Sequence, residues 1–385
     1  MNARSLLVTK PPLSVPITPA THEAVPAGVR ATAIASGAEW NDLVLELGDP
    51  DLRQGYEWGE LRRHVEGRSL RYAVHDGATP LAAIAATVWR PFGFPFSMLY
   101  ASRGPVLGKA SARAWPGLLQ ATAEMARRSR AVFLRCSPGV PADERGLHAA
   151  FVRSGFTRLA DDWTLWNAPR VVMALDLRPD ESTLRRAMRE STRLSLTRVW
   201  KHGGRVEQDV SEAAVDRLHR LLVAAGQRKG YPVRDLAFFQ ALRREYLAGG
   251  HGCLALASHG GRDLAGVLAV RFGRRAHLLY AAIDGDSDQA RKLRAGTAVH
   301  WAMIRWAKAS GCEVLDWGAS GTGFPPRRES LGYGIYEFKR GFGCSLTRLP
   351  GYYDLVFRPG LYRLCRTFEA RWGPALWRLR ARLNG

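Results

Sequence analysis

The order of predicted elements occurs twice along the chain, and this repeat constrains the fold more than any other feature. The first half gives two helical patterns, three strand-like runs, a helix, a strand and a helix, at 38–48, 56–65, 70–75, 81–89, 96–101, 111–129, 131–136 and 144–154. The second half gives two helices, three strands, a helix and a strand, at 211–229, 236–248, 253–259, 263–272, 276–283, 295–309 and 313–317. Corresponding elements start about 180 residues apart, so the sequence predicts two domains of one fold in tandem.

This order of two helices, an antiparallel meander, a helix and a strand is similar to that of GNAT-type acyltransferases. We therefore expect an α/β (α+β) protein with two GNAT-like domains in tandem and mixed sheets. Sustained heptads are missing from 218–250, which predicts that the second domain has no coiled-coil arm. The expected division is a disordered leader at 1–28, a first domain at 29–170 that is completed by 345–385, and a second domain at 171–344. An unrelated α/β protein with the same order of elements is the alternative.

Two basic segments lie outside the repeat. After a strand at 171–177, residues 179–201 have the pattern of one long helix with an acidic start. Residues 360–383 have the pattern of a second basic helix, with Trp372, Leu376 and Leu379 as an apolar stripe. Such a helix packs on its own protein by default, and contact with a membrane surface or with RNA are the other interpretations.

The chain is strongly cationic, with 56 Lys and Arg against 35 Asp and Glu and a net charge of +21. A field of this sign attracts polyanions such as tRNA, a precursor that carries pyrophosphate, or an anionic membrane. A solubilising surface in an arginine-rich chain would explain the same charge. The composition therefore points to classes of partner and leaves the choice among them open.

Other classes of protein are excluded by what the sequence lacks. No apolar run approaches the roughly 20 residues of a membrane helix, and the proline-rich start does not have the pattern of a signal peptide. The five cysteines form no CxxC pair and the histidines no HExxH pair, so no disulfide framework or metal site is expected. We predict a cytoplasmic protein.

Four motifs in order resemble the FemAB family. They are Gln54–Arg63 (QGYEWGELRR), Tyr100–Val106 (YASRGPV), Arg228–Arg234 (RKGYPVR) behind the basic helix at 187–203, and Tyr333–Gly343 (YGIYEFKRGFG). The corresponding family patterns are Q-S-x-x-W-G-x-x-K, Y-x-x-R-G-P-V, R-x-G-F-x-x-R and G-L-Y-x-F-K-x-G-F-G. The resemblance spans about residues 40–360, and RGPV and FKRGFG are its most specific parts.

The resemblance implies an aminoacyltransferase. It would move an amino acid from aminoacyl-tRNA to an amine on the stem peptide of a peptidoglycan precursor, either lipid II or UDP-MurNAc-pentapeptide. Aminoacyl-tRNA would be a co-substrate and no bound cofactor is expected. We also expect a monomer that can make peripheral contact with the inner face of an anionic membrane. The same chemistry in peptide antibiotic assembly is a close alternative, and a non-catalytic tRNA- or membrane-binding module is another.

A CoA-dependent N-acyltransferase is the competing enzyme class. GNAT enzymes bind the pyrophosphate of CoA with a Q/R-x-x-G-x-G/A loop at the start of a helix. The ends of the loops at 105–110 and 293–298 fit this pattern. However, Pro105 and Leu293 stand where Gln or Arg is needed, which disfavours CoA as the donor.

The resemblance places the tRNA site on the last motif. Lys339 is the first catalytic candidate, because a cation there would orient the terminal ester and offset charge on the leaving oxygen. Arg340 is expected to contact tRNA as well. Phe338 and Phe342 would stack on the terminal adenine, although packing in the core accounts equally well for both.

The other motifs give the expected acceptor site. Arg62 stands where the family has a lysine that contacts the precursor's phosphates, and a solvated helix face is its alternative. The further candidates for binding phosphate or peptide are Arg103, Arg193, Arg228, Tyr231 and Tyr280. A surface position for Arg193 and a buried strand aromatic for Tyr280 are the simpler interpretations.

The identity of a general base is the open point. Family members often carry an acid just after RGPV, and this chain has Leu107 and Gly108 there. Asp316, at the end of the strand predicted at 313–317, is the alternative acid in the catalytic set. Without a base, the amine would lose its proton to water or to the substrate.

Overall fold

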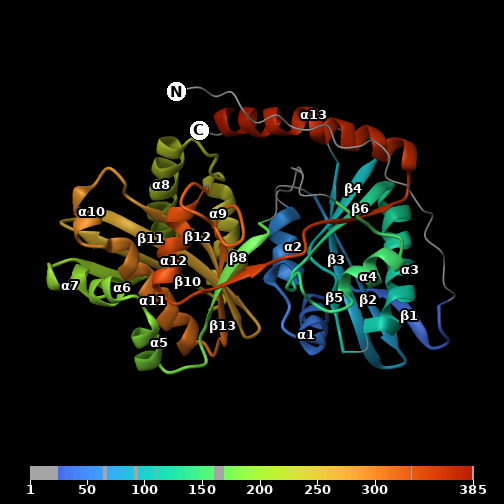
Figure 1. Cartoon of the computed structure of the whole chain (residues 1–385), viewed down its shortest axis with the longest axis horizontal. Helices are drawn as coiled ribbons and strands as arrows, with labels where there is room; N and C mark the ends of the chain where they lie inside the picture. The colour runs from blue at the N-terminus through green and yellow to red at the C-terminus, as the bar shows by residue number, and fades with distance from the viewer. Residues whose placement is uncertain are drawn as a thin grey trace.

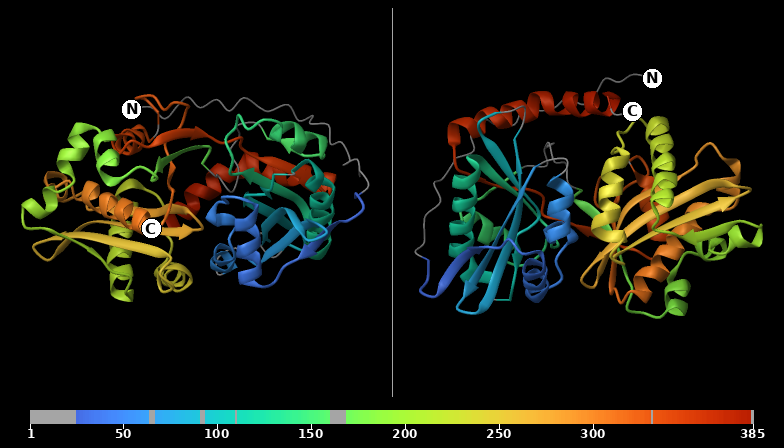
Figure 2. Two further views of the ribbon diagram at one scale, coloured as in Figure 1. Left: turned by 90° about the horizontal axis from the view of Figure 1, so that it is seen from below. Right: turned by 180° about the vertical axis from the view of Figure 1, so that it is seen from behind.

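The computed structural model describes residues 25–63, 67–90, 94–109, 111–159, 169–330 and 332–383. They form two mixed sheets that lie side by side, each flanked by helices (Figures 1 and 2). The disorder predicted for 1–28 falls almost wholly outside the described residues.

The first repeat opens with an additional strand. Its elements are β1 (Val29–Ala33), α1 (Gly37–Leu47), a 3-10 turn (Leu52–Gln54), α2 (Tyr56–Arg63), β2 (Ser69–Asp76), β3 (Thr79–Trp89), β4 (Ser97–Arg103), β5 (Val106–Leu107), α3 (Ser111–Ser129), β6 (Ala131–Pro138), α4 (Leu147–Arg153) and β7 (Thr157–Arg158). The sheet order is β1-β2-β3-β4-β6-β15-β7, with β5 beside β3, and β15 (Tyr353–Val356) comes from near the end of the chain. Only β4 and β6 pair in parallel among these strands.

The second repeat begins at β9 and has the same order of main helices and strands as the first. The chain continues through β8 (Val171–Asp176), α5 (Glu181–Ala187), α6 (Glu190–Ser195), α7 (Arg198–Lys201), β9 (Arg205–Gln208), α8 (Glu212–Lys229), α9 (Leu236–Leu242), a π-helical turn (Arg243–Leu247), β10 (Gly252–His259), β11 (Arg262–Phe272), β12 (Arg275–Ile283), α10 (Asp288–Lys292), α11 (Ala295–Ala309), β13 (Val314–Ala319), α12 (Tyr333–Gly341) and β14 (Ser345–Arg348). The sheet order is β14-β8-β13-β12-β11-β10-β9, and β12 and β13 are its parallel pair. Every helix and strand predicted for the repeat is present, and sequence reasoning missed the strands β1, β5, β7, β9 and β14.

The long helix predicted for 179–201 is wrong. The segment forms α5, α6 and α7, with extended backbone at Met188 and Arg189. The backbone N–H of Arg189 donates to the carbonyl of Gly341 at 2.9 Å, and this contact with α12 interrupts the helix. Gly341 is required at this approach, because a Cβ there would lie 2.6 Å from Thr192 Oγ1.

One hydrophobic cluster spans the contact between the two domains, in addition to a core within each domain. Helices α1 and α2 of the first domain and helices α8 and α9 of the second face each other in the same cluster. Its members include Trp40, Leu52, Leu61, Leu218 and Phe239. Equivalent helices of the two repeats therefore form the contact between the domains, and any site at this contact is built from both halves of the chain.

The end of the chain returns to the first domain. Strand β14, just after the predicted boundary at 344, pairs with β8 of the second sheet, and β15 (Tyr353–Val356) then joins β6 and β7 of the first. Helix α13 (Pro359–Leu383) follows, as predicted, and packs its first half on β6. No helix in the described parts of the chain has the length and apolar character needed to cross a membrane.

Candidate active site between the two domains

The parallel strands β12 and β13 separate early. They are in register only from Arg275 and Val314 to His277 and Asp316, and β13 then bulges before Gly318. In the first domain, by contrast, β4 and β6 remain paired from Ser97 to Arg103. Strand separation leaves backbone groups without a neighbouring strand, so the second domain is where other groups can bind the sheet.

Lys339 of α12 occupies this opening. Its side chain is 6% exposed, and its Nζ donates hydrogen bonds to the carbonyls of Trp317 and Ala319 on β13. Burial lowers the pKa of Lys339 to about 8. A protonated amine has three N–H bonds, so the two carbonyls leave one donor for a substrate oxygen. A neutral amine would have none left.

The two phenylalanines of the last motif differ in exposure. Phe342 is fully buried, 4.9 Å from the ring of Trp317, and has no surface for a nucleotide base. Its expected stacking on tRNA is therefore corrected to core packing. Phe338 is half-buried and packs edge-on against His300, with a ring-centroid distance of 5.0 Å. Core packing accounts for its described contacts, and its role in stacking stays a prediction.

A basic surface adjoins α12. Arg189 at the start of α6 and Arg340 on α12 both pair with Glu337, at 2.8 and 3.1 Å. Arg193 lies in the same short helix α6 and is half-buried. These three arginines exceed the two carboxylates on the same helices, Glu190 and Glu337, so this surface beside α12 is cationic.

Arg62 lies in a cluster of cations and phenols between the domains. Burial, and then the nearby charge of Arg234, lowers the pKa of Arg62 to about 10, and Tyr100 and Tyr280 act on it in the opposite direction. The Arg62 guanidinium is 6.0 Å from the ring of Trp58. Burial raises the pKa of Tyr280, whose ring packs 4.7 Å from Phe239. Several positive groups near half-buried phenols form an arrangement suited to a multiply charged anion.

Arg103 enters this region from the first domain. It is 7% exposed, with φ of 60°, and its Nη2 donates to the carbonyl of Pro169 at 3.2 Å. Burial, and then the charge of Arg53, lowers the pKa of Arg103. Its Nε is 3.8 Å from Asp51. Arg103 is therefore an anchored cation beside the interface.

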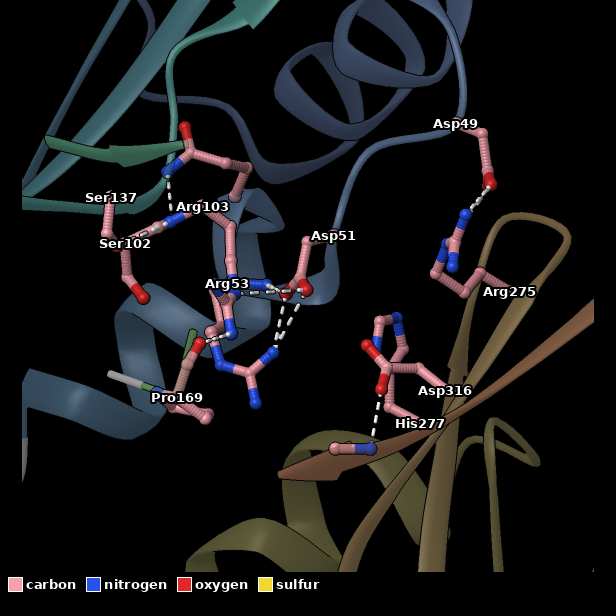
Figure 3. Close-up of polar contacts among 12 residues, drawn as sticks. Asp49, Asp51, Arg53, Ser102, Arg103, Ser137, Pro169, Arg275, His277 and Asp316 are labelled. Carbon is pink, nitrogen blue, oxygen red and sulfur yellow. Dashed lines mark hydrogen bonds and ion pairs between the residues drawn. The ribbon is translucent and has the colours of Figure 1, made fainter. Parts of the chain in front are cut away.

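Asp51 lies at the centre of a cluster of charged and polar side chains where the two domains meet (Figure 3). Its two oxygens accept hydrogen bonds from Arg53 Nη1 at 2.8 and 3.0 Å. On the opposite side lie His277 and Asp316, with His277 Nδ1 3.7 Å from Asp316 Oδ2. Next to this cluster, Arg275 of β12 pairs with Asp49 at 2.6 Å. Charges from both domains thus meet beside the opening between β12 and β13.

The same residues have the donor types of a metal site. One ligand atom from each of Asp51, His277 and Asp316 lies within 4.8 Å of the other two. However, Arg53 already occupies both oxygens of Asp51, and Arg103 adds a second guanidinium. A divalent cation would face two fixed positive charges, so the residues fit an ion-pair network better than a metal centre.

Asp316 is a poor candidate for a general base. Burial favours its neutral form, but the contact with His277 and the charge of Arg53 outweigh it and keep the pKa of Asp316 below its usual value. Its Oδ1 also accepts the backbone N–H of Gly318 at 2.6 Å. A carboxylate held in this way binds a proton weakly. Its hydrogen bond to Gly318 instead stabilises the bulge in β13.

Two predicted acceptor residues lie in a different setting. Arg228 at the end of α8 is 3.5 Å from Asp286 and donates to the carbonyl of Ile283 at 3.4 Å. Tyr231 is half-buried just beyond Arg228, and burial raises its pKa. The partners of Arg228 are the last residue of β12 and the loop just beyond it, and the backbone N–H of Tyr231 donates to the carbonyl of Gly226 on α8. These contacts do not place the two residues among those around Arg62.

Sequence reasoning missed the residues that connect the motifs. Gln54 is fully buried and bonds Ala85 and the carbonyl of Ser102, which ties the first motif to the second. A Cβ at Gly104 would lie 2.6 Å from Gln54, so RGPV needs glycine there. Asp51, Arg53 and His277 had no signal of their own, although Arg53 directly precedes the first motif.

Family models match both halves of the chain. The model described as FemAB family matches residues 47–260, and that of an acetyltransferase (GNAT) domain matches residues 181–340. The lipid II:glycine glycyltransferase of Staphylococcus haemolyticus (strain JCSC1435) is 24% identical over 411 residues, which covers 87% of this chain and 95% of that protein. The protein of the same name from Staphylococcus aureus (strain MRSA252) is 21% identical over 396 residues, covering 83% and 91%.

Solved structures have the same fold. The crystal structure of FemX has a TM-score of 0.77 at 19% identity, covering 87% of this chain and 99% of that one. A tandem GNAT protein from the clavulanic acid biosynthesis pathway has a TM-score of 0.52 at 13% identity, covering 85% and 98%. These likenesses confirm the predicted pair of GNAT-like domains.

Proposed function

Because this chain belongs to the FemAB family and is a transferase, we propose that it moves an amino acid from aminoacyl-tRNA to the stem-peptide amine of a peptidoglycan precursor. The acceptor is lipid II or UDP-MurNAc-pentapeptide. The observation that carries this proposal is Lys339, a buried cation with one N–H bond to spare at the opening between β12 and β13.

The donor side is served by Lys339 and the basic surface around it. An aminoacyl ester is already activated, so the protein needs to place the amine near the carbonyl and to stabilise the oxygen that gains charge. The third N–H bond of Lys339 would donate to that oxygen. Arg189, Arg193 and Arg340 adjoin the same helix and would contact phosphates of the acceptor end of tRNA.

The acceptor side is served by the cluster around Arg62. Lipid II and the UDP-linked precursor both carry a diphosphate, and the cluster offers Arg62 and Arg234 near the phenol of Tyr280, with Arg103 near Tyr100. Guanidinium groups bind phosphate oxygens in pairs. The diphosphate would thus be bound at the contact between the domains, and the stem peptide would extend toward Lys339.

The proton of the attacking amine leaves without a strong protein base. Asp316 has a lowered pKa, and His277 is 2% exposed with Asp51 covering it from the first domain. Transfer to water or to a substrate group is therefore the route we propose. The reaction needs no bound cofactor, because aminoacyl-tRNA supplies the activated carbonyl.

The proposal is tested with the full chain and tRNA charged with radiolabelled amino acids. Lipid II and UDP-MurNAc-pentapeptide are offered separately, with and without RNase. Label that reaches a precursor only without RNase supports the proposal and identifies the acceptor and the amino acid. RNase-resistant transfer, or transfer from acyl-CoA, would refute the tRNA donor. A parallel reaction contains a cell extract in place of these precursors. Label that reaches only small molecules of this extract would support antibiotic assembly instead.

A further inference from the structure

The outward face of α13 exposes apolar side chains between arginines. Leu364 is 67% exposed and Phe368 is 40% exposed, one helical turn apart. Arg363 and Arg371 beside them are also exposed. Leu and Phe at this exposure lose hydrophobic stabilisation that another surface would restore.

The opposite face of α13 fixes this orientation. Glu369 is 1% exposed and bonds Arg135 at 2.7 Å, and Arg135 also bonds Asp354 on β15 at 2.7 Å. Tyr362 donates to Asp354 at 2.9 Å, and its ring packs edge-on against Phe133 at 5.3 Å. Leu364 and Phe368 therefore point away from the sheet and cannot turn inward without breaking a buried ion-pair network.

A neighbouring hairpin extends the same type of surface. Phe96, just before β4, packs in the cluster that contains Tyr362 and Leu361 of α13, and its ring lies 4.9 Å from the guanidinium of Arg358. Phe94, two residues earlier, is 57% exposed, and Arg90 is exposed as well. Aromatic and basic side chains are thus present on the hairpin that adjoins the start of α13.

The charge of α13 has one sign. Residues 359–383 contain six arginines and a single acid, Glu369, which is buried against Arg135. The helix lies along one side of the molecule and runs from the first domain toward α8 of the second (Figures 1 and 2). Side chains beyond Arg371, including those of the predicted stripe at Trp372, Leu376 and Leu379, lie outside what the structure describes.

We propose that the outward face of α13, with Phe94 of the adjoining hairpin, binds the surface of an anionic phospholipid bilayer. Leu364, Phe368 and Phe94 would enter the interfacial region, while Arg358, Arg363 and Arg371 would contact lipid phosphates. RNA is the weaker fit, because an exposed leucine offers nothing to a phosphate backbone. The inference goes beyond the transfer reaction, which needs no bilayer when its acceptor is a water-soluble precursor.

The test measures co-sedimentation of the full chain with vesicles that contain no substrate. Vesicles of phosphatidylcholine alone are compared with equal mixtures of phosphatidylcholine and phosphatidylglycerol. We expect the wild type to bind the mixed vesicles preferentially and less tightly at high salt. Leu364→Ser/Phe368→Ser should weaken this binding by at least about tenfold, because each exposed apolar side chain contributes to partitioning. Leu194→Ser on α6 is the matched control, with a leucine that is 69% exposed, and should bind as the wild type does.

Several outcomes would overturn the inference. Wild-type binding that is equally tight to neutral and anionic vesicles would contradict the inference. A double variant that binds like the wild type would also contradict it. A double variant that changes a dimer into a monomer would assign the face to self-association, and a loss confined to tRNA affinity would assign it to RNA. Transfer to UDP-MurNAc-pentapeptide by the double variant should be unchanged, so a failure of this inference is distinguishable from a failure of the proposed function.

Discussion

Replacing Lys339 by methionine tests the centre of the proposed mechanism. Methionine keeps most of the buried side-chain volume and removes the charge and all three N–H donors. The loss of one donor to a developing oxyanion costs about 10²- to 10³-fold in kcat, and we expect a decrease of that order. The assay is single-turnover transfer of labelled amino acid, which separates chemistry from product release.

The pH dependence of kcat/KM gives a second, quantitative test of the role of Lys339. With a pKa of about 8, Lys339 is about 90% protonated at pH 7 and about 10% protonated at pH 9. The third N–H bond is lost together with the charge, so the contribution of Lys339 to kcat/KM should decrease about tenfold between these values. The ratio of wild-type to Lys339→Met kcat/KM isolates this effect, because deprotonation of the acceptor amine affects both proteins equally.

Stability provides an independent measurement on the same variant. The pKa of Lys339 is lower in the folded protein than in the unfolded chain, whose value is 10.5. Between pH 8 and 10.5 the unfolded state binds more protons, so the free energy of unfolding of the wild type should increase with pH by up to about 3 kcal/mol relative to Lys339→Met. A rate ratio that stays constant from pH 7 to 9, or Lys339→Met activity within about threefold of wild type, would refute the proposed role.

Three further predictions concern the framework of the site and are checked by urea unfolding. Arg135→Met removes the buried guanidinium between Asp354 and Glu369, which leaves Asp354 with the Tyr362 hydroxyl and Glu369 with Arg366, and it should cost about 3–5 kcal/mol; Arg127→Met, which removes an exposed pair with Glu124, should leave the midpoint unchanged. Gln54→Ala should cost about 1–3 kcal/mol, because the backbone groups of Ala85 and Ser102 lose their partner. Arg53 and the other nearby cations keep the pKa of Asp51 below the unfolded value of 3.8 despite its burial. Its stabilisation is therefore present above the unfolded value and is lost as pH falls through the folded value, so the difference in stability between wild type and Asp51→Asn should shrink as pH falls below about 4.

The repeat could be predicted because hydrophobic periodicity is a local property. The predicted helix at 111–129 and the strands at 70–75 and 263–272 depend on side chains within one segment, and the structure places all three within a residue or two of their predicted ends. The interruption of 179–201 could not be predicted in this way. It depends on a hydrogen bond between Arg189 and Gly341, and sequence patterns within 179–201 contain no information about it.

The site could be predicted from the sequence only in part, for the same reason. Lys339 and Arg62 belong to motifs that single out a residue, and the structure places both beside the contact between the domains. Asp51 and His277 are single residues about 230 positions apart, without a motif around either. Their proximity follows from the packing of one domain on the other, which no pattern in one segment encodes.

The two repeats differ in their parallel strands. In the first domain β4 and β6 remain paired up to Arg103, whose side chain is buried at the end of β4. In the second domain β12 and β13 separate after His277 and Asp316, and the opening accepts Lys339. In the proposed mechanism one repeat supplies cations for an anionic acceptor, and the other supplies an N–H donor for a charged transition state. The ion pair between Asp49 and Arg275 joins the two domains beside this proposed reaction centre.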